Sequence, residues 1–169
     1  MDLTNFFLYG YIHHRDSNIQ VESFDDANFV DCATLRDDVD VQRADSRYVD
    51  KLNALHDYLG KTYIKQLFDE YTLTQCAMWA GVDSGSSVWH NDHKQGGRFT
   101  SNLLVYLDDN NQELGNFIQV RGSEFEHTIY PKRGDFVWLN QKSCFEHRAQ
   151  NDNGLRRVLS FEFYIPALL

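Results

Sequence analysis

Proline, cysteine and basic residues are scarce in this 169-residue chain, and each scarcity argues against a class of protein. With only two prolines and no low-complexity tract, nothing marks a linker, so we expect one domain over residues 1–169. The three cysteines, Cys32, Cys76 and Cys144, form no CxxC motif. They predict neither a disulfide framework nor a thiolate zinc site, and they favour a reducing, cytoplasmic location.

Positive charge and long apolar runs are also lacking. Sixteen Lys and Arg against 25 Asp and Glu give a net charge of -9, which does not attract polyanions, so we expect no nucleic-acid partner. The longest apolar stretch, Phe6 to Ile12, is interrupted by Gly10 and is far shorter than the ~20 residues of a membrane span. The start of the chain has no basic targeting segment, and we expect no membrane association.

Charge and patterning change near residue 72. Residues 1–72 hold 14 acidic and 7 basic side chains, whereas the remainder is nearly neutral. Apolar residues recur every three or four positions over 46–71, which is typical of a helix that Gly60 divides in two. Residues 5–12 resemble a strand, and the Asp-rich stretch 25–45 has no period and indicates loops. We therefore expect an acidic supporting region over 1–72.

Residues 73–169 are rich in β-branched and aromatic residues, in short runs separated by turn sequences. The runs are 73–80, 99–107, 116–120, 127–130, 135–139 and 157–165. Many short strands joined by tight turns predict a sandwich or barrel. The expected fold class is mainly β (α+β), with a supporting N-terminal helix or helices.

Three residues have the types and spacing of a metal site. In an extended backbone His90 and Asp92 point to the same side, and His147 can reach them from a neighbouring antiparallel strand. Two imidazoles and one carboxylate form the facial triad typical of non-haem Fe(II). A helical reading pairs His90 with His93 instead, but the Ser/Gly-rich sequence before His90 favours an extended chain, so we treat His93 as a loop residue.

An arginine ten residues after His147 adds a second signal. Period-two alternation places Arg157 with Leu159 and Phe161 on an apolar face, and Arg156 on the opposite one. A buried guanidinium requires an anion, because an unpaired buried charge costs several kcal/mol or more. The anion can be an internal carboxylate or a bound ligand.

The order of motifs resembles the prolyl-hydroxylase-like branch of the 2-oxoglutarate- and Fe(II)-dependent oxygenases. The resemblance covers about residues 73–165. Its motifs in order are Trp89-His90-Asn91-Asp92, Gly96-Gly97-Arg98, Leu103 to Asp108, Gly115 to Ile118, Pro131 to Val137, Glu146-His147 and Arg157.

This resemblance implies a fold, cofactors and site residues. The fold is a double-stranded β-helix, a cupin-like jelly roll of two four-stranded sheets over 73–169. Fe(II) is held by His90, Asp92 and His147, and the distal carboxylate of 2-oxoglutarate by Arg157 and the hydroxyl of Tyr106. The implied reaction uses O2 to hydroxylate an unactivated C–H bond and releases succinate and CO2.

Two questions stay open from the sequence. The substrate is a peptidyl, prolyl-like side chain or a small metabolite, and the acidic N-terminal region favours a basic or neutral one. The alternative function is a non-catalytic, cupin-like metal-binding or sensor protein that holds Zn(II) or Ni(II) on the same triad. An interior arginine favours the enzyme, because a structural metal site needs no such cation.

Overall fold

The computed structural model describes residues 3–27, 30–31, 46–82, 85–86, 88–92, 99–152 and 155–169. Its elements, in chain order, are α1 (Thr4–Leu8), β1 (Tyr11–Arg15), η1 (Val21–Phe24), β2 (Val30–Asp31), η4 (Ser46–Tyr48), α2 (Val49–Leu59), η5 (Gly60–Ile64), β3 (Thr72–Val82), β4 (Gly85–Ser86), β5 (Ser101–Tyr106), β6 (Phe117–Arg121), β7 (Glu126–Ile129), β8 (Asp135–Asn140), β9 (Glu146–Asn151), β10 (Leu155–Tyr164) and η6 (Pro166–Leu168).

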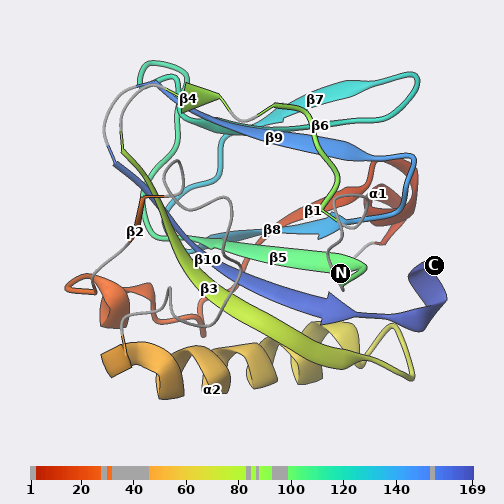
Figure 1. Cartoon of the computed structure of the whole chain (residues 1–169), viewed down its shortest axis with the longest axis horizontal. Helices are drawn as coiled ribbons and strands as arrows, with labels where there is room; N and C mark the ends of the chain where they lie inside the picture. The colour runs from red at the N-terminus through yellow and green to blue at the C-terminus, as the bar shows by residue number, and fades with distance from the viewer. Residues whose placement is uncertain are drawn as a thin grey trace.

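Two sheets stacked face to face form the body of the molecule (Figure 1). The major sheet has the order β1-β8-β5-β10-β3-β2, and the minor sheet has the order β4-β9-β6-β7. Every pairing is antiparallel except the short one between β2 and β3. This is the jelly-roll arrangement expected from the sequence, with β1 and β2 added at the two edges of the major sheet.

The two faces of the major sheet have different partners. Leu159 and Phe161 of β10 share a core cluster with Leu52 and Leu59 of α2, so this face lies toward the helices. Val158 shares a second cluster with residues of both sheets, so the opposite face lies between the sheets. We call these the outer and the inner face. They alternate along every strand, as the pleat requires.

The helical region differs in detail from the predicted helix over 46–71. The α-helix α2 ends at Leu59, and Gly60 begins the π-helical turn η5, so Gly60 divides the segment as predicted. A Cβ at Gly60 would lie 2.8 Å from the ring of Tyr71. Tyr58 and Tyr63 donate hydrogen bonds of 2.8 and 2.7 Å to Asp16, which tie this region to the segment after β1.

The N-terminal prediction is wrong in one respect. Residues 5–12 do not form one strand: α1 ends at Leu8 and β1 begins at Tyr11. Gly10 makes the change of direction with φ of 76°, and the ring of Phe145 fills the space where a Cβ would stand. The region predicted to act only as support thus supplies strands to the major sheet.

Parts of the sequence prediction fall outside the described residues. They include most of the Asp-rich stretch, His93, Gly96-Gly97-Arg98 and Cys32. Cys76 and Cys144, which are described, are free thiols. Within the described ranges, no helix has the length and apolar character needed to cross a membrane.

Candidate metal centre

The backbone brings His90 and His147 side by side. His147 lies near the start of β9, and His90 lies in the segment between β4 and β5. The amide of His90 donates to the carbonyl of His147 at 3.0 Å, and the amide of His147 donates to the carbonyl of His90 at 2.8 Å. This isolated antiparallel bridge places the two rings 4.3 Å apart, centroid to centroid.

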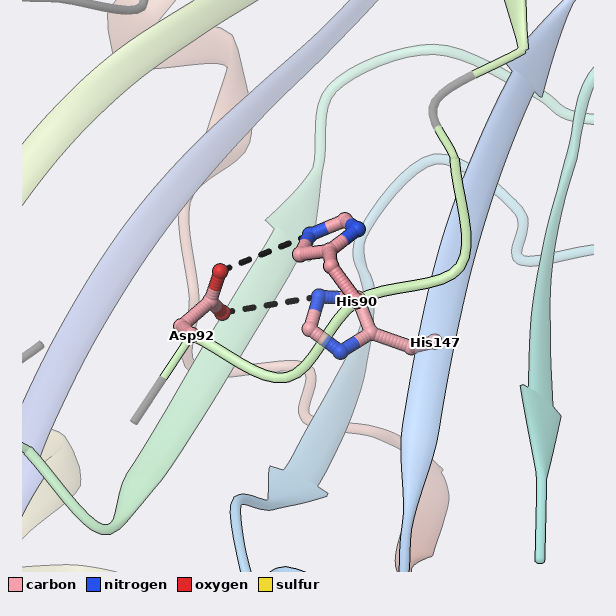
Figure 2. A group of neighbouring side chains, drawn as sticks. All are labelled: His90, Asp92 and His147. Atoms are coloured by element: carbon pink, nitrogen blue, oxygen red, sulfur yellow. Dashed lines mark ion pairs between the residues drawn. The ribbon is translucent and has the colours of Figure 1, made fainter. Parts of the chain in front are cut away.

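Asp92 completes the predicted triad. Figure 2 shows its carboxylate directed toward both imidazoles: Oδ1 is 3.4 Å from Nε2 of His90, and Oδ2 is 3.5 Å from Nε2 of His147. One ligand atom from each residue lies within 4.8 Å of the others. The sequence-predicted residues therefore meet at one point.

The hydrogen bonding of His90 determines which of its nitrogens faces this point. Nδ1 of His90 is 2.7 Å from the carbonyl oxygen of Val88, so Nδ1 carries the proton and Nε2 presents a lone pair. Burial lowers the pKa of His147 to about 4, and His90 adds to the lowering while Asp92 opposes it. His147 is thus neutral at pH 7. Three electron-pair donors facing one another fit a bound cation, which removes their mutual repulsion.

Two side chains outside the triad hold it in place. The amide nitrogen of Asn91 donates to the carbonyls of Gln141, Lys142 and Phe145 at 3.0, 3.1 and 2.9 Å. Gln141 binds Asp92 twice, accepting from its backbone amide and donating to Oδ2, both at 3.1 Å. The sequence did not identify Gln141 as a residue of the site, because its contact with Asp92 depends on the conformation of the turn between β8 and β9.

Strand register places His147 on the inner face of the minor sheet. His147 of β9 pairs with Val120 of β6, and Val120 pairs with His127 of β7. Directly paired residues share a face, and Val120 belongs to the cluster between the sheets. Tyr11 of β1 reaches across to His127, with its hydroxyl 3.1 Å from Nδ1, and so links the two sheets at this edge.

The predicted position of Arg157 relative to the site is wrong. Alternation does group Arg157 with Leu159, but that apolar face is the outer one, packed on the helices. The Arg157 guanidinium binds Asp108 through Nε at 3.0 Å and through a terminal nitrogen at 2.7 Å, and it also donates to the carbonyl of Asp25 at 3.2 Å. Its anion is therefore an internal carboxylate, and because both faces of β10 are buried, the sequence pattern could not show which face holds the site.

Arg156 occupies the inner face instead. It precedes Val158 by two positions, and Val158 pairs with Tyr106 of β5 in the cluster between the sheets. Nε of Arg156 and the hydroxyl of Tyr106 are both buried, and neither has a partner with hydrogen-bond geometry among the residues that the structure describes. Burial raises the pKa of Tyr106 to about 12, and Arg156 opposes the rise through its charge and its nearness as a hydrogen-bonding group, so the two side chains are neighbours. An unsatisfied buried polar pair of this kind is costly without a ligand.

Glu162 is a further inner-face residue to which the sequence analysis assigned no role. It lies on the same face of β10 as Arg156 and Val158, and it is only 8% exposed. Burial and, to a smaller extent, the negative charge of Asp92 together raise the pKa of Glu162 to about 8. Period-two alternation along the strand already places Arg156 and Glu162 on the same face. The sequence pattern could therefore have identified both as inner-face residues.

Comparison with known proteins supports the fold. No protein-family model matches the sequence, and no curated protein matches it. Among solved structures, the chain is similar to a prolyl hydroxylase from Trichoplax adhaerens in complex with a hypoxia inducible factor peptide, at TM-score 0.70 and 14% identity over 98% of this chain and 88% of that one.

Two further solved structures lead to the same fold. HygX from Streptomyces hygroscopicus, with nickel, 2-oxoglutarate and hygromycin B bound, gives TM-score 0.68 and 18% identity over 97% of this chain and 86% of that one. A 2OG-Fe(II) oxygenase family protein from Burkholderia pseudomallei gives TM-score 0.54 and 13% identity over 66% and 55%. The chain has the double-stranded β-helix fold of the 2-oxoglutarate- and Fe(II)-dependent oxygenases, prolyl hydroxylases among them.

Proposed function

We propose that this protein is a 2-oxoglutarate- and Fe(II)-dependent oxygenase, with His90, Asp92 and His147 as the iron ligands. The donor set supports the assignment, because two imidazoles and a carboxylate suit a divalent first-row metal and leave coordination positions open. Bound Fe(II) supplies the redox chemistry that couples O2 to the oxidation of 2-oxoglutarate and of a substrate. The contribution of the chain is to hold, orient and shield the reactants.

Arg156 and Tyr106 bind the distal carboxylate of 2-oxoglutarate in this proposal. The observation that carries it is their unsatisfied state: a buried guanidinium nitrogen and a buried hydroxyl face the same interior as the triad and lack partners among the described residues. A carboxylate satisfies both at once, through charge-assisted hydrogen bonds. Arg156 thereby takes the role that the sequence resemblance implied for Arg157, which is already paired with Asp108.

The protonation states favour binding of a dianion. Tyr106, with its pKa near 12, keeps its hydroxyl proton at pH 7 and is available as a donor. The surrounding inner-face residues are apolar and buried, among them Ile118, Val137 and Val158. They exclude water from the cosubstrate, so the contacts to its carboxylate are stronger than in solvent.

The reaction we propose is hydroxylation of a C–H bond, with release of succinate and CO2. The substrate is a peptide side chain or a small molecule. Similar solved structures include one protein bound to a peptide and one bound to hygromycin B, so this fold accommodates both kinds of substrate.

Succinate formation tests the proposal. Purified protein with Fe(II), 2-oxoglutarate and O2 is expected to release succinate, slowly without substrate and faster with one. His90→Ala, Asp92→Ala and His147→Ala should each abolish release and iron binding. His14→Ala, which changes an exposed histidine outside the triad, should do neither. Tight metal binding without any succinate, and without 2-oxoglutarate binding, would identify a non-catalytic metal protein instead.

A further inference from the structure

Among the described residues of β10, Glu162 is the one that brings a carboxyl group to the inner face. Glu162 is only 8% exposed, and its carboxyl group takes part in none of the side-chain hydrogen bonds or ion pairs observed among the described residues. Its oxygens are not among the fully buried side-chain atoms that lack a partner, so they keep some access to the space around them. Its position is fixed from behind, because Nε2 of the buried His56 bonds the backbone carbonyl of Glu162 at 2.9 Å from the outer side. A carboxyl group that is largely withdrawn from water is stabilised by a hydrogen-bond or ionic partner, and a bound ligand can supply one at this position.

Glu162 belongs to a polar band on the inner face. It pairs with Gln75 of β3 on one side and with Asn102 of β5 on the other, so the three side chains form a row across adjacent strands. Asn102 is only 7% exposed and accepts a 3.0 Å hydrogen bond from Ser160. The neighbouring inner-face cluster is apolar, including Val158 and Leu139. A polar band here faces the space beside the triad, where Asp92 is close enough to interact electrostatically with Glu162.

Two candidate partners for this carboxyl group can be set aside. The metal is not one, since the ligand atoms that converge come only from His90, Asp92 and His147 within the described part of the chain. The distal carboxylate of the cosubstrate is not one either, because the proposed function assigns it to Arg156 and Tyr106.

The sum of the charges in the site with metal and 2-oxoglutarate bound indicates which kind of group would bind beside Glu162. A divalent metal, a dianionic cosubstrate, Asp92 and the Arg156 guanidinium together carry no net charge, so ionisation of Glu162 leaves one negative charge uncompensated unless a cation binds beside it. A cation offsets this charge best and forms charge-assisted hydrogen bonds in a dry site.

We infer that Glu162 is a specificity-determining residue that binds a cationic nitrogen, an ammonium or guanidinium, on the substrate. The inference rests on the proposed function and names the substrate class of that site. The substrate is then a free basic metabolite or a lysyl- or arginyl-type side chain of a peptide. The excess of negative charge on the whole chain assists its approach.

Calorimetry with matched ligands tests this inference without turnover. The protein is loaded with Zn(II) in place of Fe(II) and with 2-oxoglutarate. It is then titrated with L-lysine and L-norleucine, with L-arginine and L-citrulline, and with the Nα-acetyl amides of lysine and norleucine. Wild type should bind the cationic member of at least one pair about 10- to 100-fold more tightly than its neutral partner. The free and capped forms distinguish a metabolite from a peptidyl side chain.

Three variants make the result specific. Glu162→Gln should remove the preference and leave 2-oxoglutarate affinity unchanged, whereas Glu162→Asp, which keeps the charge, should retain part of it. Glu124→Gln, the same change at an exposed position, should behave as wild type. Absence of any preference in wild type, or a preference that survives Glu162→Gln, would overturn the inference.

A cation of the chain itself is the remaining competitor. Lys94 and Arg98 lie in the sequence just after Asp92, outside the described residues. If ligand preference emerges only after Lys94→Gln or Arg98→Gln, the partner of Glu162 is internal and the inference fails. Failure of the proposed function looks different, because Zn(II) and 2-oxoglutarate then do not bind together in any variant.

Discussion

Replacing each of two adjacent arginines is the most discriminating mutation experiment. Arg156 and Arg157 have the same charge and are sequence neighbours, but they point to opposite faces of β10. Arg156 lies beside the Tyr106 hydroxyl with Nε unsatisfied, whereas Arg157 binds Asp108 on the outer side. The sequence analysis assigned 2-oxoglutarate binding to Arg157, whereas the proposed function assigns it to Arg156. Replacing each arginine in turn therefore decides between the two assignments.

The expected magnitudes follow from these environments. Arg156→Ala removes a charge-assisted contact to a desolvated carboxylate, worth about 2–5 kcal/mol, and should raise the 2-oxoglutarate requirement roughly 30- to several thousand-fold. Stability should change little, because the apo protein loses an unsatisfied buried group. Arg157→Ala removes a partly exposed ion pair, worth up to about 1 kcal/mol, and should lower Tm by about 2–4 °C without affecting 2-oxoglutarate.

The assay is succinate release against 2-oxoglutarate concentration at saturating Fe(II), together with thermal unfolding of each metal-free variant. Arg156→Lys serves as the conservative control and should recover part of the affinity, since it restores the charge without the planar fork. A large 2-oxoglutarate defect in Arg157→Ala with Arg156→Ala near wild type would refute the assignment of faces. A defect in neither would refute the cosubstrate site.

Three further outcomes are expected. Tyr106→Phe should weaken 2-oxoglutarate binding about 3- to 10-fold yet raise the Tm of the apo protein, because it removes a buried hydroxyl that has no partner until the ligand binds; equal losses in both measurements would contradict this. Gln141→Leu should weaken metal affinity about 10- to 100-fold in a competition titration, since Gln141 orients Asp92 through two hydrogen bonds, and unchanged affinity would exclude that role. Folded Glu162 holds its proton up to about pH 8 and the unfolded chain only to about pH 4.5, so metal-free wild type should lose stability as pH rises through this window; Glu162→Gln should not, and parallel Tm profiles would show that Glu162 is not buried as described.

The sequence was sufficient for the features that depend on local pattern. The triad was predictable because extended backbone places His90 and Asp92 on one side, and a neighbouring strand delivers His147. The jelly roll and the break at Gly60 followed from strand spacing and helix periodicity in the same way. These predictions do not depend on knowing which face of the major sheet packs on the helices and which packs on the minor sheet.

The rest required tertiary information. Alternation correctly separated Arg156 from Arg157, but both faces of β10 are buried, one on helices and one on the minor sheet, so pattern alone could not decide which face holds the site. Gln141 reaches Asp92 only because of the β8–β9 turn. The start of β1 at Tyr11 depends on the turn at Gly10, where Phe145 packs from a distant part of the sequence.

Absorption spectroscopy under anaerobic conditions tests the central claim most directly. Fe(II) and 2-oxoglutarate added together to the protein should produce a weak visible charge-transfer band, since chelation of the iron by the cosubstrate is the step on which the proposed oxygenase depends. The band should be absent in Asp92→Ala and should require much more 2-oxoglutarate in Arg156→Ala. Tight Fe(II) binding by wild type with no band at any 2-oxoglutarate concentration would contradict the account.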